Sequence, residues 1–119
     1  MLVFEMARIL LAEADPDVRR LLVLLLERLG HEVVVLEGPP GVAPRADLMV
    51  LEPASGSCLG HARRARDLQP SLPVICVSIL PEDASFLAFG PVDYLAKPFA
   101  IDDLRDAVER ALDHSPQAA

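Results

Sequence analysis

Four polar side chains in this sequence each end, or directly follow, a short apolar run. Glu13 and Glu52 carry carboxylates, Ser78 carries a hydroxyl and Lys97 carries an ammonium group. If the apolar runs are parallel strands, their carboxyl ends meet at one edge of a sheet, where folds of this kind bind ligands. The four groups would then converge in one crevice. The alternative is that strand ends are simply where polar residues begin.

Lys97 is the only lysine in the chain, which has ten arginines and neither Asn nor Thr. This composition indicates a bias against lysine. A lysine retained just before Pro98, at the end of an expected strand, therefore indicates a function, with chance survival as the alternative.

Apolar runs and helical patterns alternate along the chain, which is typical of a parallel sheet covered by helices. Strands are expected at residues 7–12, 33–36, 48–51, 74–78 and 92–96, and helices at 16–29, 59–68, 82–89 and 101–112. Residues 37–44 are too rich in Pro and Gly for a helix. The pattern predicts one α/β doubly wound domain over residues 7–113, with an N-terminal extension (1–6) and a C-terminal tail (114–119).

The first helix has clear end signals and an apolar stripe. Asp15 suits the N-cap, Pro16 the first helical position and Gly30 the residue after the helix. The stripe expected to face the core consists of Val18, Leu21, Leu22, Leu25 and Leu29. Val23 and Leu26 fall outside it and are expected to leave an exposed apolar patch, so a homodimer contact is left open.

Composition excludes several classes of protein. A formal net charge of −7 argues against nucleic-acid binding, so Arg63, Arg64 and Arg66 are expected to form a solvated face. No apolar run approaches the length of a membrane span, and the first residues do not resemble a signal peptide. Cys58 and Cys76 lack metal-ligand spacing, so we expect neither zinc nor a disulfide, and a cytoplasmic location.

The motifs of this chain resemble those of a known family. They lie at residues 8–11, 15–22, 47–51 (just ahead of Glu52), 73–75 and 93–99, the last reading Asp-Tyr-Leu-Ala-Lys-Pro-Phe. Together they resemble the receiver domain of bacterial two-component response regulators, from Arg8 to Leu112. The resemblance implies a flavodoxin-like, five-stranded parallel sheet of order 2-1-3-4-5. Short connections imply a degenerate second helix and a shortened fourth helix.

The resemblance also implies a role for each residue of the crevice. Glu52 stands at the position of the phosphoacceptor aspartate, and Glu13 in the acidic pocket that helps to bind Mg²⁺. Ser78 and Lys97 match residues that contact the phosphoryl group, and the peptide bond after Lys97 is expected to be cis. Tyr94 matches an aromatic residue that changes rotamer on activation.

Three departures from the family pattern act against phosphotransfer. Glu52 is one methylene longer than aspartate, and in-line transfer depends on positioning. Ala14 stands where a second acidic residue would ligate Mg²⁺. Ile79 is bulky where the family usually keeps a small residue. We therefore expect no catalytic residue, no metal ligand and no cofactor, with Mg²⁺ only if the site works conventionally.

Charge counting predicts an internal ion pair in the crevice. Glu13, Glu52 and Lys97 carry a net charge of −1, whereas the family's usual pocket carries −2 and calls for a dication. An ion pair of Glu52 with Lys97 would gain about 4 kcal/mol of gross Coulomb energy at an effective dielectric near 20, before desolvation. Whether Glu52 mimics the phosphorylated acid or the site is merely inert is left open. Asp47 begins its strand, at the wrong edge to act as an acceptor.

The leading prediction is an atypical receiver domain without phosphoacceptor activity, which signals through contacts with another protein (a sensor kinase, an effector or a regulator). The alternative is a conventional Mg²⁺-dependent receiver that uses Glu52 or a rearranged site. An enzyme is not expected, because the sequence has no Gly-rich phosphate loop after the first strand and no nucleophile–base pair. Neither nucleic acid nor a membrane is expected as a partner.

Overall fold

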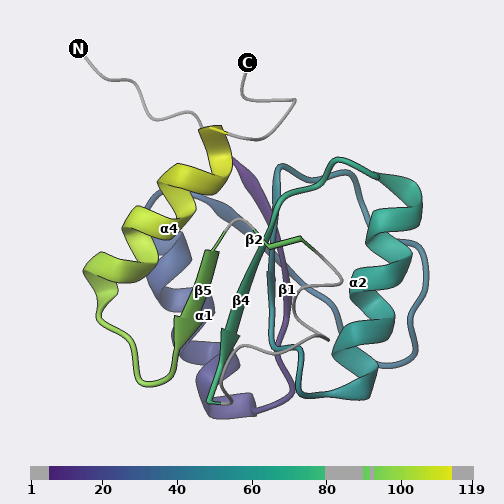
Figure 1. Ribbon diagram of the computed structural model, residues 1–119, viewed down its shortest axis with the longest axis horizontal. Coiled ribbons are helices and arrows are strands. Elements are labelled where there is room, and N and C mark those ends of the chain that lie inside the picture. Colours follow the sequence, from purple (N-terminus) through teal and green to yellow (C-terminus); the bar gives the residue numbers. More distant parts are fainter. Residues whose placement is uncertain (1–5, 80–89, 92, 114–119) are drawn as a thin grey trace.

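The computed structural model describes residues 6–79, 90–91 and 93–113. Five parallel strands form one sheet in the order β2-β1-β3-β4-β5 (Figure 1). The strands are β1 (Arg8–Ala12), β2 (Glu32–Val35), β3 (Leu48–Leu51), β4 (Val74–Ser78) and β5 (Asp93–Ala96). The helices within the described ranges are α1 (Pro16–Arg28), α2 (Gly56–Leu68) and α4 (Ile101–Asp113). The predicted α/β class and strand order are confirmed.

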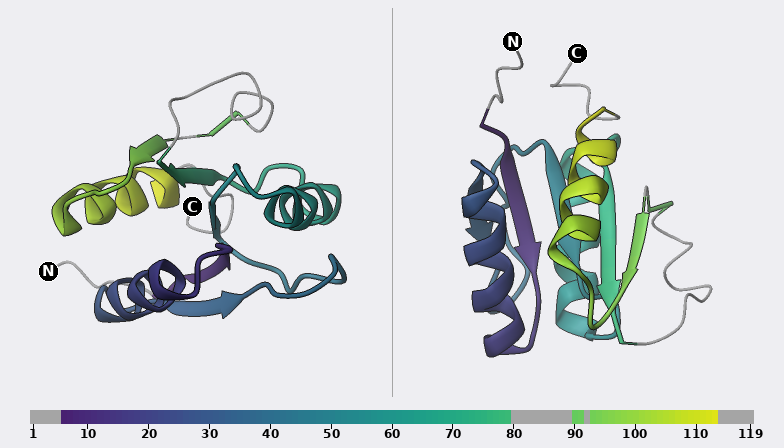
Figure 2. Two further views of the ribbon diagram at one scale, coloured as in Figure 1. Left: turned by 90° about the horizontal axis from the view of Figure 1, so that it is seen from below. Right: turned by 90° about the vertical axis from the view of Figure 1, so that its left-hand side faces the viewer.

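Helices cover both faces of the sheet. α1 and α4 lie on one face and α2 lies on the other (Figure 2). Alternate residues of β1 therefore enter different cores: Ile9 and Leu11 pack with α1 and α4, whereas Leu10 packs with α2. All three are fully buried. Burial on both faces explains why the central strands are continuous apolar runs without alternation.

The ends of α1 agree with the sequence prediction. The Asp15 carboxylate accepts hydrogen bonds from the backbone N–H groups of Asp17 (2.9 Å) and Val18 (3.3 Å), and Pro16 begins the helix. The chain leaves the helix through Gly30, whose φ of 95° lies in the left-handed region that favours glycine. The N-cap thus fixes the start of α1 close to the carboxyl end of β1, at the carboxyl edge of the sheet.

The predicted inward stripe of α1 is partly wrong. Leu26 is fully buried and Val23 packs against the core, whereas Leu21 is 48% exposed. The buried face is centred between Leu22 and Leu26, and Leu21 lies roughly 120° from that centre on a helix of 3.6 residues per turn. The exposed apolar surface of α1 therefore consists of Leu21 and Leu24 rather than Val23 and Leu26.

α2 begins three residues earlier than predicted. Ser55 caps it by accepting a long hydrogen bond from the Cys58 N–H (3.5 Å), and the first turn contains Gly56 and Ser57, which favour helix formation weakly. The helical pattern in the sequence therefore became visible only at Leu59.

Residues 36–47 contain no helix, which confirms the prediction made for residues 37–44, and part of this loop packs on α2. A Cβ added to Gly60 would lie 2.8 Å from Cγ of Pro40, so the Pro40 ring packs this closely on α2 only because residue 60 is glycine. His61 is buried and its Nε2 lies 3.0 Å from the Gly38 carbonyl oxygen. The loop thus takes up space against α2 in place of a second helix.

Other sequence predictions lie outside the described residues. These are the helix at 82–89, Val92 of the last strand, the tail at 114–119 and nearly all of the N-terminal extension. Within the described part, no helix is long and apolar enough to cross a membrane.

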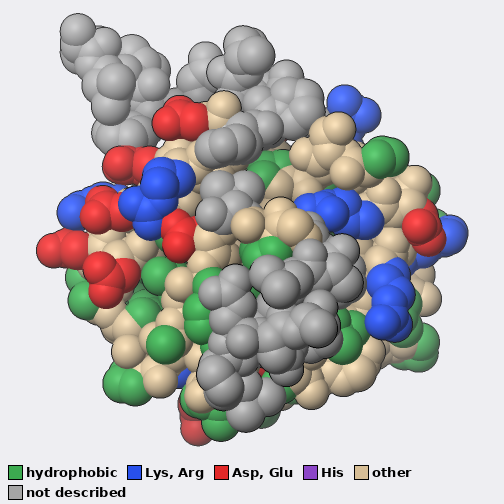
Figure 3. All heavy atoms as spheres, viewed as in Figure 1, with side chains coloured by type: hydrophobic (Ala, Val, Ile, Leu, Met, Phe, Trp, Pro, Cys, Tyr) green, Lys and Arg blue, Asp and Glu red, His purple; other side chains and the backbone are tan. Residues whose placement is uncertain are grey.

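The surface carries opposite charges over α4 and α2. Acidic side chains gather over α4, and basic side chains gather over α2 (Figure 3). Arg63 and Arg64 are exposed, as predicted for a solvated face. Arg66 is half-buried instead, and its Nε donates a hydrogen bond to the Leu72 carbonyl (2.7 Å).

Candidate functional site

The carboxyl edge of the sheet brings together the predicted acidic and basic side chains. Glu13 and Glu52 directly follow β1 and β3, and the Glu52 N–H donates to the Ala12 carbonyl (2.9 Å), which holds the two strand ends together. Lys97 directly follows β5, and its N–H donates to the Ser78 carbonyl (2.9 Å). Backbone pairing therefore positions each of these residues.

The Lys97 ammonium group bridges the two glutamates. Its Nζ lies 2.5 Å from Oε1 of Glu13 and 2.9 Å from Oε2 of Glu52. The Glu13 and Glu52 side chains are only 2% and 8% exposed, and that of Lys97 is 13% exposed. The predicted ion pair with Glu52 is confirmed, and Glu13 joins it to form a buried triad.

Backbone amides hold the outer oxygens of both carboxylates. Oε2 of Glu13 accepts from the Asp15 N–H (3.1 Å), and Oε1 of Glu52 accepts from the Ala54 N–H (2.8 Å). Every carboxylate oxygen of the triad therefore has a donor. This matters because a buried carboxylate without hydrogen bonds would cost several kcal/mol.

The environment of Lys97 favours its charged form. Burial by itself lowers the pKa of the Lys97 ammonium group, but the hydrogen bonds and charges of Glu13 and Glu52 outweigh burial and raise that pKa above its ordinary value. Lys97 therefore stays protonated at neutral pH and neutralises one of the two glutamate charges.

These residues do not fit Mg²⁺, the ion that the resemblance implies for this position. The ammonium group lies between the two carboxylates where a cation would bind, and Ala14 contributes no oxygen ligand from its side chain. Mg²⁺ requires near-octahedral oxygen coordination. Among the described residues, no group of three or more His, Cys, Asp or Glu side chains is placed to hold a metal ion.

The remaining predicted residues surround the triad in different ways. Ser78 is fully buried at the end of β4, next to the triad through its backbone bond to Lys97. Tyr94 lies opposite Cys76 in the sheet, and its side chain packs against the core on the α2 side with its hydroxyl buried. Ile79 is 74% exposed just beyond the site. The peptide bond after Lys97 is cis, as expected.

Cys58 borders the site, although no sequence signal pointed to it. Its thiol is buried in the first turn of α2. Burial is the main reason why the pKa of this thiol is raised, and the charges of Glu13 and Glu52 act in the same direction, against hydrogen bonds with Ser55 and Ser57. The thiol therefore stays protonated at neutral pH, beside the negative charge of the site.

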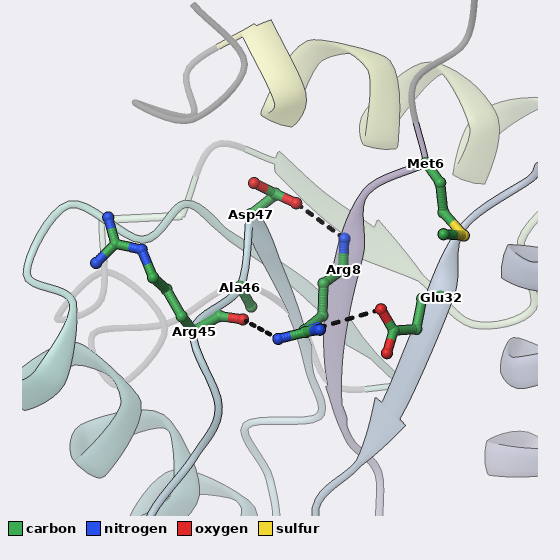
Figure 4. Close-up of a pocket in the computed structure, with 6 residues that line it drawn as sticks. All are labelled: Met6, Arg8, Glu32, Arg45, Ala46 and Asp47. Carbon is green, nitrogen blue, oxygen red and sulfur yellow. Dashed lines mark hydrogen bonds and ion pairs between the residues drawn. The ribbon is translucent and has the colours of Figure 1, made fainter.

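A second group of charged residues lies at the opposite, amino edge of the sheet. A pocket of about 260 Å³ there is lined by Met6, Arg8, Glu32, Arg45, Ala46 and Asp47 (Figure 4). Asp47 accepts a hydrogen bond from the Arg8 N–H (2.9 Å), and Arg8 pairs with Glu32 (3.1 Å). Asp47 is thus separated from the triad by the length of the sheet, as predicted.

Solved structures share this fold across most of the chain. A CheY-like receiver domain from Methanospirillum hungatei matches with a TM-score of 0.79 and 21% identity, covering 97% of this chain and 100% of the other. The response regulator TrrA from Thermotoga maritima, in complex with Mg²⁺ and BeF, matches with a TM-score of 0.72 and 25% identity, covering 89% and 99%. NtrX from Brucella abortus matches with a TM-score of 0.74 and 24% identity over 92% of this chain, which spans only 27% of NtrX.

These structural neighbours establish the fold class. They include response-regulator receiver domains, and the present chain has the CheY-like receiver fold. No protein-family model matches the sequence, and no curated protein matches it either.

Proposed function

We propose that this chain is a receiver-type module of two-component signalling whose site is not switched by phosphorylation. In this proposal the chain has no catalytic activity of its own, and it acts in the cytoplasm through contacts with a sensor kinase, an effector or a regulator. The observation that carries the proposal is the bridging of Glu13 and Glu52 by the Lys97 ammonium group.

The triad argues against phosphotransfer at two points. A metal ion could enter between the carboxylates only if it displaced Lys97 from both of them, which would leave a largely buried ammonium group without its two carboxylate partners. Transfer also depends on positioning and on metal charge, and the Glu52 oxygens are already held by Lys97 and by the Ala54 N–H. The fold supports the receiver assignment, and the triad supports its independence from phosphorylation.

Mg²⁺ titration with a phosphoryl donor or mimic tests the proposal. Backbone NMR spectra of the chain would be recorded with Mg²⁺ and either acetyl phosphate or beryllofluoride, with TrrA as the positive control because its structure contains Mg²⁺ and BeF. We expect no saturable shift changes around Glu52, Ser78 and Tyr94. Saturable changes there would favour the alternative, a conventional receiver that uses Glu52 or a rearranged site.

A matched variant tests which residues are responsible. Ala14→Asp combined with Glu52→Asp adds an acidic side chain after β1 and shortens the carboxylate after β3, which frees space beside Lys97. We expect this double variant to show saturable shifts with Mg²⁺ and beryllofluoride. Ala54→Asp, which adds a carboxylate at a nearby exposed position, is the control and should stay silent.

A further inference from the structure

The outer face of α1 carries two exposed leucines that the core does not use. Leu21 and Leu24 are 48% and 49% exposed, and they lie next to each other along the helix because residues three apart are neighbours. α1 packs inward on β1 and the edge strand β2, so its outer face lies at the margin of the molecule (Figure 2). Two adjacent leucines in an otherwise charged face form a short apolar seam.

The residues around the seam follow coiled-coil spacing. Asp17, Leu21, Leu24 and Arg28 are separated by four, three and four residues, which is the spacing of a helix–helix seam. All four are exposed. Leu21 and Leu24 thus lie between an acidic residue, Asp17, near the start of the helix and a basic residue, Arg28, at its end.

The charges beside the seam complement those of a second copy in an antiparallel arrangement. When two α1 helices pair around a two-fold axis between Leu21 and Leu24, each Leu21 lies opposite the partner's Leu24. Asp17 then lies opposite the partner's Arg28.

A second charged pair flanks the seam. Arg20 and Glu27 are exposed on the same side of it, and in the antiparallel arrangement each lies opposite the other residue of the partner. A parallel arrangement would instead place Asp17 and Arg28 each opposite its own copy and would leave Arg20 and Glu27 without an oppositely charged partner across the seam. The face is therefore self-complementary in one orientation only.

We propose that the outer face of α1 is a homodimer interface in which two copies pair antiparallel through Leu21 and Leu24. One helix per copy buries less area than a stable protein–protein interface usually requires, so the dimer is weak and reversible. This inference does not depend on the proposed function, because the triad lies at the carboxyl edge of the sheet and the leucines do not contact it.

Sedimentation equilibrium of the whole chain at low ionic strength tests the proposal, because screening of exposed charges is then small. We expect association that increases with concentration. Leu24→Glu should abolish it, because the change places two like charges in the apolar seam. Ile101→Glu is the matched control on α4, where Ile101 is 46% exposed, and it should leave the dimer unchanged.

A charge swap tests the antiparallel orientation. Arg20→Glu alone and Glu27→Arg alone each place like charges opposite each other at two symmetric contacts, and each should raise the dimer Kd by about fivefold. The combination of both changes restores opposite charges and should return the Kd to within about twofold of the original. Circular dichroism checks that each variant is folded.

Three results would overturn the proposal. The first is a monomer at every concentration reached, and the second is a dimer that survives Leu24→Glu. The third is a double swap that binds no better than either single change.

Discussion

The two edges of the sheet hold similar groups in different surroundings. At the carboxyl edge, Lys97 joins two glutamates whose side chains are less than a tenth exposed. At the amino edge, Arg8 pairs with Glu32, and both side chains are more than two fifths exposed. Each edge thus consists of oppositely charged groups in contact, but only one of them is removed from water.

Burial decides how much each arrangement contributes to stability. Exposed ion pairs contribute little because water and salt screen them and because long side chains lose freedom in forming them. A buried charge that loses its partner is not solvated by water, so breaking the buried arrangement is costly. The carboxyl edge should therefore dominate the response of the protein to mutation, although the amino edge has the larger number of charged residues around a pocket.

Removal of the Lys97 charge should have the largest effect. Lys97→Met leaves Glu13 and Glu52 buried without a cation, and we expect the free energy of unfolding at pH 7 to fall by about 3 kcal/mol. Urea denaturation measures this change. The control combines Lys97→Met with Glu13→Gln and Glu52→Gln, which should recover part of the loss because no charge is then left unpaired. An unchanged midpoint for Lys97→Met alone would contradict a structural role for the triad.

Alkaline pH should weaken the same edge. The raised pKa of Lys97 means that the folded state holds this proton more tightly than the unfolded chain, whose pKa is near the ordinary value of 10.5. The stabilisation is fully present below pH 10.5 and is lost as the pH rises through the folded pKa, at no more than about 1.4 kcal/mol per pH unit. Denaturation at several alkaline pH values should show a narrowing gap between the natural chain and Lys97→Met. A constant gap would count against the raised pKa.

Acid should weaken the amino edge through His31. Its Nδ1 accepts a hydrogen bond from the Ala7 N–H (3.1 Å), and burial lowers the pKa of this imidazole, with the charge of Asp47 opposing. The unfolded chain therefore binds this proton first as the pH falls below 6.5. Stability should decline there, at no more than about 1.4 kcal/mol per pH unit, until the folded pKa is passed.

Comparison with His31→Asn isolates that contribution. The asparagine amide oxygen can accept from the Ala7 N–H but does not titrate, so the variant should show a flatter decline as the pH falls below 6.5. Thermal unfolding at matched pH values provides the measurement. Equal slopes for the two proteins would exclude His31 as the cause.

The smallest effect is expected at the exposed pair. Arg8→Ala removes the ion pair with Glu32 and a hydrogen bond to the Arg45 carbonyl (3.2 Å), and should lower the free energy of unfolding by about 0.5 kcal/mol. High salt should reduce the difference further. If Arg8→Ala lowered the free energy of unfolding as much as Lys97→Met, the difference in exposure between the two edges would not explain their contributions to stability.

The site was more predictable from sequence than the helix faces. Glu13, Glu52 and Lys97 end apolar strands, and parallel strands bring their carboxyl ends together wherever such runs alternate with helices. The bond between Lys97 and Glu13 was not predicted, because it depends on side-chain rotamers across 84 residues of sequence. Cys58 was missed because its nearness to the carboxylates arises only when α2 folds back on the sheet.

The orientation of α1 could not be predicted for a different reason. Most positions from Val18 to Leu29 are apolar, so more than one rotation of the helix places leucines against the sheet. Packing against β1 and β2 selects the rotation that buries Leu22 and Leu26. The first residue of α2 could not be predicted because Gly56 and Ser57 favour a helix only weakly. The N-cap at Ser55 sets where the helix begins.

The contact between Pro40 and Gly60 means that these two positions, although distant in sequence, are expected to change together in evolution. Because the proline ring occupies the space where a Cβ of residue 60 would lie, a side chain at position 60 is tolerated only if the Pro-Gly connection changes with it. Lineages that keep this short connection should therefore keep glycine in the middle of α2, despite its low helix propensity. Lineages with a full helix in place of the connection are free of that constraint. We therefore expect a glycine at this place in the helix to occur together with the short proline-containing loop.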